Sequence, residues 1–135
     1  MRRYLLDVNA LVALGLREHA LFERVVVWVQ KLDADTDEFA TCAVTELGFI
    51  RVLTQAATPY ALSIAEAKSA LQRLKASGNI PFVFIADDQD ASKLPMWVKT
   101  SRQTTDGHLA QLAKVKNGML ATLDRGIPGA FVIPE

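Results

Sequence analysis

Short apolar runs alternate along this chain with longer segments whose apolar residues recur at helical spacing. The runs occupy residues 4–7, 39–42, 81–85, 119–123 and 131–133. The alternation predicts strands separated by helices, which are connected by right-handed crossovers in a mainly parallel sheet covered on both faces. The sequence therefore predicts an α/β fold with about five strands. The run at 81–85 is apolar throughout, as in a strand that is buried on both faces.

The segments between these runs carry the signals of helix starts and stops. Helices are expected over about 8–16, 20–32, 43–56, 63–76 and 104–117, with a shorter one near 94–100. Ser63 and Glu66 have the spacing of a capping box at the start of one helix. The acidic tracts at 33–38 and 87–90 are interpreted as hydrated loops, because no apolar framework fixes their geometry.

Length and composition indicate one domain, residues 1–135, of the soluble globular class. Half of the residues are hydrophobic and 22% are charged, which is typical of such proteins. The apolar stretches are too short to span a bilayer, and the N-terminus lacks the layout of a signal peptide. Cys42 is the single cysteine, so no intrachain disulfide is possible. We therefore expect a cytoplasmic protein without membrane association.

The charge balance gives no direct sign of a nucleic-acid partner. The chain has 15 basic and 15 acidic residues, a formal net charge of zero, whereas nucleic-acid binders are usually basic. If four of the acids are gathered into one pocket, however, the remaining surface has a net positive charge. The composition therefore permits nucleic-acid binding without indicating it.

Four acidic residues interrupt apolar stretches or stand at their edges: Asp7, Glu46, Asp106 and Asp124. A charge in such a place is costly to desolvate unless it is paired, hydrogen-bonded or bound to a metal. Asp7 and Asp124 follow predicted strands, and in parallel sheets the functional crevice lies beyond the carboxyl ends of the strands. Glu46 and Asp106 lie on predicted helices, and their position at the same edge is compatible with the topology but not required by it.

A group of three or four carboxylates suits one or two Mg²⁺ ions, which prefer oxygen ligands and keep several waters. Such ions generate hydroxide from bound water and stabilise charge on a phosphate under attack. The four acids, if they meet, therefore predict a metal site for phosphodiester hydrolysis.

Four motifs give the chain a resemblance to a known family. They are LLDVNAL at 5–11, TELGF at 45–49, TTDGHL at 104–109 and ATLDRG at 121–126. Together, in this order and spacing, they closely resemble the PIN-domain ribonucleases, and within these the VapC-type toxins of bacterial toxin–antitoxin pairs. Each motif is weak alone, and the resemblance covers nearly the whole chain.

The resemblance implies a three-layer α/β/α fold that cleaves RNA with Mg²⁺, or with Mn²⁺ as a substitute. By position, Asp7 and Asp106 match direct metal ligands, while Glu46 and Asp124 match acids that act directly or through water. Asn9 and Thr105 match polar positions that bind ligands or substrate, and Arg125 is placed to contact phosphate. Gly107 departs from the usual Ala of the third motif, which predicts a looser first turn in that helix.

The same resemblance implies partners. They are an RNA substrate, tRNA or rRNA, and a cognate antitoxin whose basic side chain enters the acidic pocket and competes with metal. It also implies a homodimer, seated on an apolar surface of the early helices, and binding to operator DNA only through the antitoxin.

Simpler interpretations stand beside these roles. Asp7 and Asp106 are also suited to capping helices, Glu46 to an exposed helix surface, and Asp124 to a turn. His108 is interpreted as a surface or partner-facing residue. Two other functions stay open: a haloacid-dehalogenase-like phosphatase, disfavoured because Asn9 stands where that chemistry needs a second Asp, and a catalytically silent RNA- or protein-binding module.

Overall fold

The computed structural model describes all residues from 1 to 135. Its elements are β1 (Arg2–Leu6), α1 (Val8–Gly15), α2 (Phe22–Gln30), β2 (Asp37–Thr41), α3 (Ala43–Thr54), α4 (Ile64–Ser77), β3 (Phe82–Phe84), α5 (Thr104–Val115), β4 (Met119–Thr122) and β5 (Phe131–Val132). The strands form one sheet in the order β3-β2-β1-β4-β5, and every neighbouring pair is parallel. The predicted α/β class and the five strands are confirmed.

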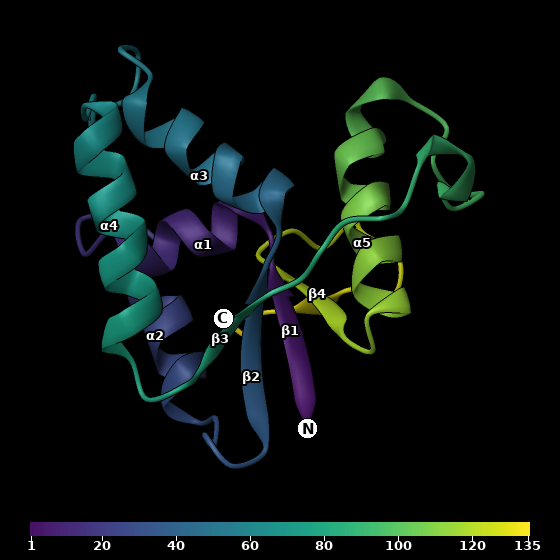
Figure 1. Ribbon diagram of the computed structural model, residues 1–135, viewed down its shortest axis with the longest axis horizontal. Helices are drawn as coiled ribbons and strands as arrows, with labels where there is room; N and C mark the ends of the chain where they lie inside the picture. Colours follow the sequence, from purple (N-terminus) through teal and green to yellow (C-terminus); the bar gives the residue numbers. More distant parts are fainter.

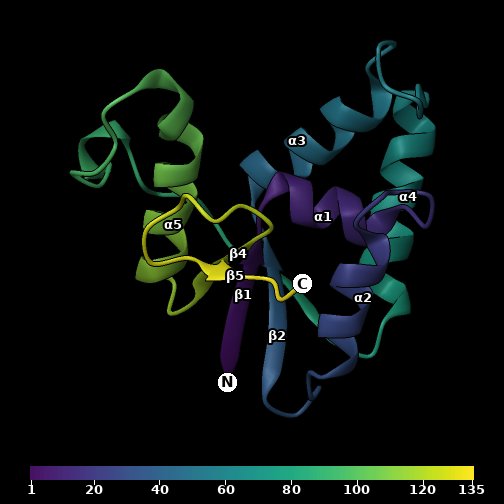
Figure 2. The ribbon, with the colours of Figure 1, turned by 180° about the vertical axis from the view of Figure 1, so that it is seen from behind.

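The sheet separates two layers of helices of unequal size. Helices α1 to α4 lie on one face and α5 lies on the other, as Figures 1 and 2 show from opposite sides. Successive side chains of the central strand β1 point to opposite faces of the sheet and so contribute to both cores. Tyr4 and Leu6 belong to the core under the first helices, and Leu5 belongs to the core under α5. The architecture is therefore three-layered, α/β/α.

Two helix boundaries follow the local signals in the sequence. Ser63 and Glu66 form the predicted capping box at the start of α4, through hydrogen bonds of 3.0 and 2.9 Å between side chains and backbone N–H groups. The helix α5 is followed by Asn117 in the left-handed region, with φ at 63°, which brings the backbone N–H of Gly118 to the carbonyl of Ala113. No helix is both long and apolar enough to span a membrane.

The interpretation of residues 33–38 as a hydrated loop is wrong at its end. Asp37 and Glu38 open strand β2 and are buried. The parallel register places them beside Arg2 and Arg3 of β1, whose guanidinium groups lie 2.8 and 2.6 Å from the two carboxylates. Pairing with basic residues more than 30 positions away allows acids to occupy a strand that the local sequence did not predict.

Two further expectations are corrected by the surroundings of the chain. The helix expected near 94–100 is absent, and two short 3₁₀ turns, Ala91–Lys93 and Ser101–Gln103, flank that segment instead. The segment lies against the first turn of α5, where Val98 and Pro95 approach Gly107, so it follows the surface of that helix. Strand β3 is an edge strand with Phe84 57% exposed, so its apolar composition did not mean burial on both faces.

Candidate active site

Three of the four predicted acids lie at the carboxyl edge of the sheet. Asp7 directly follows β1, Asp124 follows β4 after one intervening residue, and Asp106 lies in the first turn of α5. Asp7 is buried with 6% of its surface exposed, Asp106 is half-buried, and Asp124 is exposed. Helix α5 leads into β4, which pairs with β1, and this connection brings the three aspartates to the same edge of the sheet.

Asp7 is the most firmly held of the three. One carboxylate oxygen accepts a hydrogen bond of 2.8 Å from the backbone N–H of Ala10, so Asp7 caps helix α1. The other oxygen accepts a 2.5 Å hydrogen bond from the hydroxyl of Thr122. These two contacts fix the carboxylate at the end of β1 and leave each oxygen with a lone pair for a further ligand.

Thr122 is a site residue that the sequence analysis missed. Its hydroxyl donates to Asp7 and accepts a 3.0 Å hydrogen bond from the backbone N–H of Asp124. Thr122 therefore links two of the three acids across neighbouring parallel strands. The signal that identifies it is its place at the end of β4, two residues before Asp124.

The aspartates interact as like charges. Burial raises the pKa of Asp7 most, its hydrogen bonds with Thr122 and Ala10 lower that pKa, and the charges of Asp106 and Asp124 raise it further. Burial, and then the charge of Asp124, raise the pKa of Asp106. No basic side chain forms an ion pair with any of the three. The carboxyl edge of the sheet therefore carries three acids that no basic side chain of the protein neutralises.

Glu46 stands apart from this group. It lies in the first turn of α3, where one of its oxygens accepts hydrogen bonds of 2.6 Å from both the hydroxyl of Thr41 and the ammonium of Lys75. Its charge does not contribute to the raised pKa of either Asp7 or Asp106. The structure brings together three of the predicted acids and holds the fourth toward α4.

The other predicted site residues lie near these acids along the chain, and their roles stay predictions. Asn9 is exposed in the first turn of α1, and Thr105 is exposed beside Asp106. Arg125 is exposed and forms an ion pair of 2.7 Å with Glu135. A weak pair between two exposed groups leaves Arg125 able to exchange partners.

Gly107 is explained by packing. A Cβ atom at this position would overlap a methyl group of Val98 and meet Pro95 at 3.5 Å. The segment carrying these residues rests directly on the first turn of α5, which Gly107 allows. The departure from Ala in the third motif therefore accompanies a close contact between this segment and α5, and the looser turn stays a prediction.

His108 contacts a loop and lies turned toward Asp87 at 2.5 Å between Nε2 and the carboxylate. Together with the 3.4 Å contact of Lys116 with Asp88, this pair attaches the loop after β3 to helix α5. The tract at 87–90 is a loop, as predicted.

The aspartate group fits a hard divalent cation by its donor chemistry. All of its ligand atoms are carboxylate oxygens, which Mg²⁺ and Mn²⁺ accept, and its repulsion is what a cation would relieve. No three acidic, imidazole or thiol groups stand close enough to enclose an ion on their own. Mg²⁺ usually keeps several waters and uses only one or two carboxylates, so a closed cage is not needed.

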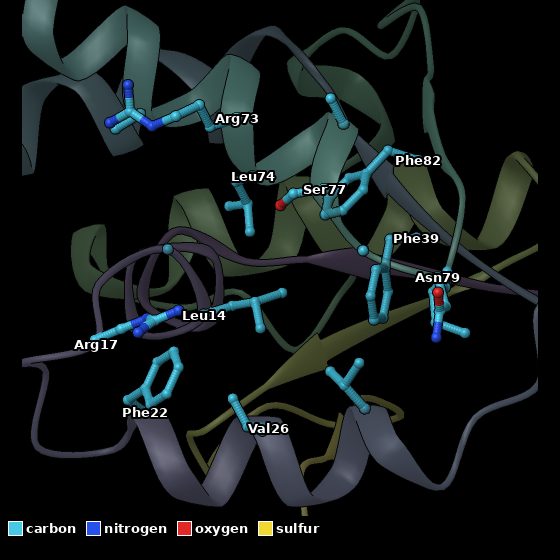
Figure 3. A pocket seen from close by; sticks show the side chains of 16 residues that line it. Leu14, Arg17, Phe22, Val26, Phe39, Arg73, Leu74, Ser77, Asn79 and Phe82 are labelled. Carbon is cyan, nitrogen blue, oxygen red and sulfur yellow. The ribbon is translucent and has the colours of Figure 1, made fainter.

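A concave surface lies at the C-terminal end of α1, whereas Asp7 caps the N-terminal end of that helix. It is a groove of about 590 Å³ between α1, α2 and α4, walled mainly by apolar side chains such as Leu14, Val26 and Leu74. Figure 3 shows Arg17 and Arg73 on its rim. The groove is suited to an amphipathic partner, with apolar contact along its walls and acidic groups beside the two arginines.

Comparison with known proteins adds sequence relatives across almost the full length. The PIN-domain family model matches residues 4–130. Ribonuclease VapC38 of Mycobacterium tuberculosis is 40% identical over 91% of this chain and 86% of its own. Ribonuclease VapC44 of the same species is 35% identical over 95% of this chain and 94% of its own.

Solved structures share the fold. VapBC2 of Rickettsia felis, bound to a DNA fragment from its promoter, matches with a TM-score of 0.64 and 14% identity, over 96% of each chain. FitAcB of Neisseria gonorrhoeae matches with a TM-score of 0.56 and 20% identity, again over 96% of each chain. At these identities the likeness supports the fold, which agrees with the three layers described above.

Proposed function

The chain belongs to the PIN-domain family, in its VapC-type branch, and from that premise we propose that it is a divalent-metal-dependent endoribonuclease. The observation that carries the proposal is the group of Asp7, Asp106 and Asp124, whose charge no basic side chain compensates. The relatives named as ribonucleases supply the substrate class. The proposed reaction is hydrolysis of RNA phosphodiester bonds.

The cation would be held by Asp7 and Asp106, with Asp124 and Glu46 acting directly or through water. When bound, Mg²⁺ or Mn²⁺ supplies a water of lowered pKa and neutralises charge on the attacked phosphate. Asp7 is presented in a fixed orientation by Thr122 and by the first turn of α1. Without the cation, the aspartates repel an RNA phosphate, so this group also makes substrate binding depend on metal.

Three exposed polar residues complete the proposed site. Asn9 and Thr105 donate or accept hydrogen bonds beside the acids, and Arg125 contacts an RNA phosphate after exchanging its partner Glu135. Their exposure fits contact with a large substrate, because RNA must approach the crevice from solvent. The RNA class that we propose is tRNA or rRNA.

We also propose that the protein is the toxin of a toxin–antitoxin pair. The structural neighbours are two-component VapBC and FitAB assemblies. The apolar groove of Figure 3 offers an antitoxin helix a place to bind, and the free aspartates offer a basic side chain of that partner a place to block metal. A homodimer, and operator DNA contacted only through the antitoxin, complete the proposal.

The test is digestion of RNA by the purified, antitoxin-free chain. A mixed pool of tRNA and rRNA is incubated with Mg²⁺ or Mn²⁺, and then with EDTA, alongside the Asp7→Asn variant. Discrete fragments that disappear with EDTA and with Asp7→Asn are expected. Intact RNA under every condition, from a folded sample that still binds RNA, would instead support the silent binding module.

The phosphatase interpretation is set aside on two grounds. The family match covers residues 4–130, and Asn9 occupies the position where haloacid-dehalogenase chemistry needs its second aspartate. Asn9 cannot act as an acid or a base.

A further inference from the structure

Glu46 is the one member of the predicted acidic quartet that forms an ion pair with a basic side chain. Lys75, which lies 29 positions further along the chain on α4, places its ammonium 2.6 Å from Oε2 of Glu46. The hydroxyl of Thr41 donates to the same oxygen, also at 2.6 Å. Two donors from two different elements therefore fix one side of this carboxylate.

The ammonium group of Lys75 has a second contact besides Glu46. It lies 5.9 Å from the centre of the Phe84 ring on the edge strand β3. The side chain of Lys75 is 30% exposed and that of Glu46 is 23% exposed. The pair is partly screened by solvent, so it is strong enough to orient Glu46 and weak enough to open when a competing cation arrives.

The two donors leave the second oxygen of Glu46 without a partner among the side-chain hydrogen bonds. A cation at the aspartate group could take Glu46 as a ligand only by drawing it from Lys75, or by sharing it with Lys75. Sharing places an ammonium charge next to the metal, which lowers the affinity for the metal. Either way, Lys75 and a divalent cation compete for the same carboxylate.

We propose that Lys75 is a positioning residue that holds Glu46 toward α4, away from the aspartate group. In the metal-free protein the site then consists of the three aspartates alone. Lys75 thereby lowers the affinity of this site for divalent cations. The inference rests on the proposed metal-dependent function, because it concerns the same site. Lys75 lies on α4, outside all four motifs. The inference gives it control over whether Glu46 can act as a metal ligand.

The experiment is a calorimetric Mn²⁺ titration of the purified metal-free chain. Lys75→Met keeps an unbranched apolar side chain and removes the charge. It is expected to tighten Mn²⁺ binding on the order of tenfold, within the usual range of coupling between linked sites. Lys75→Arg keeps the charge and should restore affinity close to that of the wild type. Lys75→Gln is a second neutral variant with a shorter stem.

The matched control is Lys68→Met, which removes the same charge from an exposed position on the same helix. Its effect should stay below about twofold, because exposed charges are screened by salt. The double variant Lys75→Met with Glu46→Gln should lose the gain of Lys75→Met.

Each result separates this inference from the proposed function. Unchanged or weaker Mn²⁺ binding in both Lys75→Met and Lys75→Gln, with wild-type binding intact, would overturn the role of Lys75 alone. A gain that survives in the double variant would also overturn it, because the effect would not pass through Glu46. Wild-type protein that binds no Mn²⁺, and behaves like Asp7→Asn, would overturn the metal-dependent function and this inference with it.

Discussion

Buried acids at the two ends of the central strands have opposite electrostatic surroundings. At the end where β1 and β2 begin, Asp37 and Glu38 pair with Arg2 and Arg3 at 2.8 and 2.6 Å. At the end where β1 stops, Asp7 is also buried, and its nearest charged influences are two further aspartates. The same residue type is thus compensated at one edge and uncompensated at the other.

The pKa directions follow this difference. Hydrogen bonding from the backbone N–H of Asp33, and then the Arg2 guanidinium, hold the pKa of Asp37 below its ordinary value despite burial. Burial, assisted by like charges, raises the pKa of Asp7. Burial of an acid is therefore no sign of function by itself. At the carboxyl edge, the absence of a compensating basic side chain is the observation that supports the proposed metal site.

The largest expected contrast is in activity. Asp7→Asn should reduce RNA cleavage more than the roughly 10–100-fold that loss of a supporting metal-site residue typically costs, because it removes a proposed metal ligand. Asp37→Asn, at the other edge, should keep the wild-type rate per folded molecule. The measurement is the initial cleavage rate with Mn²⁺ for both variants. Equal losses in the two would mean that the rate reports on folding and not on the site.

For the free energy of unfolding we expect the opposite order, with the larger loss at Asp37 and little or no loss at Asp7. Asp37→Ala removes the carboxylate that accepts hydrogen bonds from the N–H of Asp33 and from Arg2, at a cost of about 1.5–3 kcal/mol, which is typical of hydrogen bonds to a charged group. Asp7→Asn should leave the stability of the metal-free protein unchanged or improved, because Asn also caps helices and carries no repelled charge. Urea unfolding without metal compares them. A larger loss in Asp7→Asn would make Asp7 a structural acid.

The carboxyl edge should also be sensitive to shape. Gly107→Ala introduces a methyl group against Val98, and overpacking of this kind costs about 1–3 kcal/mol. Better helix propensity offsets about 1 kcal/mol of that loss. Thermal unfolding should show a net loss of stability in Gly107→Ala that the added Val98→Ala relieves. An increase in stability in Gly107→Ala alone would mean that the segment packed on α5 moves to accommodate the methyl group without a measurable cost.

The smallest expected contrast is in pH dependence. A raised pKa means that the folded chain holds the Asp7 proton more tightly than the unfolded chain, whose reference value is 3.8. The contribution of Asp7 to stability is thus complete below that pH and is lost as pH rises through the raised value. Asp37, whose pKa is lowered, contributes above 3.8 and loses its contribution on acidification.

Unfolding of the metal-free variants between about pH 3 and pH 7 checks these signs. Asp7→Asn should gain stability relative to the wild type as pH rises, and Asp37→Asn should lose stability relative to the wild type over the same range. Parallel curves for the two variants would contradict the difference between the two edges.

Much of the fold and half of the site could be predicted from local patterns. Apolar runs located all five strands, and a residue that follows a strand of a parallel sheet lies at its carboxyl edge, which placed Asp7 and Asp124. The motifs added Asp106 and Glu46 through their resemblance to a family. The helix near 94–100 and the assignment of Asp37 and Glu38 to a loop were wrong, because local composition carries no information on what packs beside a segment.

The sequence by itself determined the order of elements, the α/β class and the identity of the acids, since these depend on neighbours along the chain. Only the tertiary structure decided which acids are free. Arg2 reaches Asp37 through strand register, Lys75 reaches Glu46 through the packing of α4, and no cation reaches Asp7. The free energy of a charge depends on what surrounds it in space, and those surroundings are assembled from distant parts of the chain.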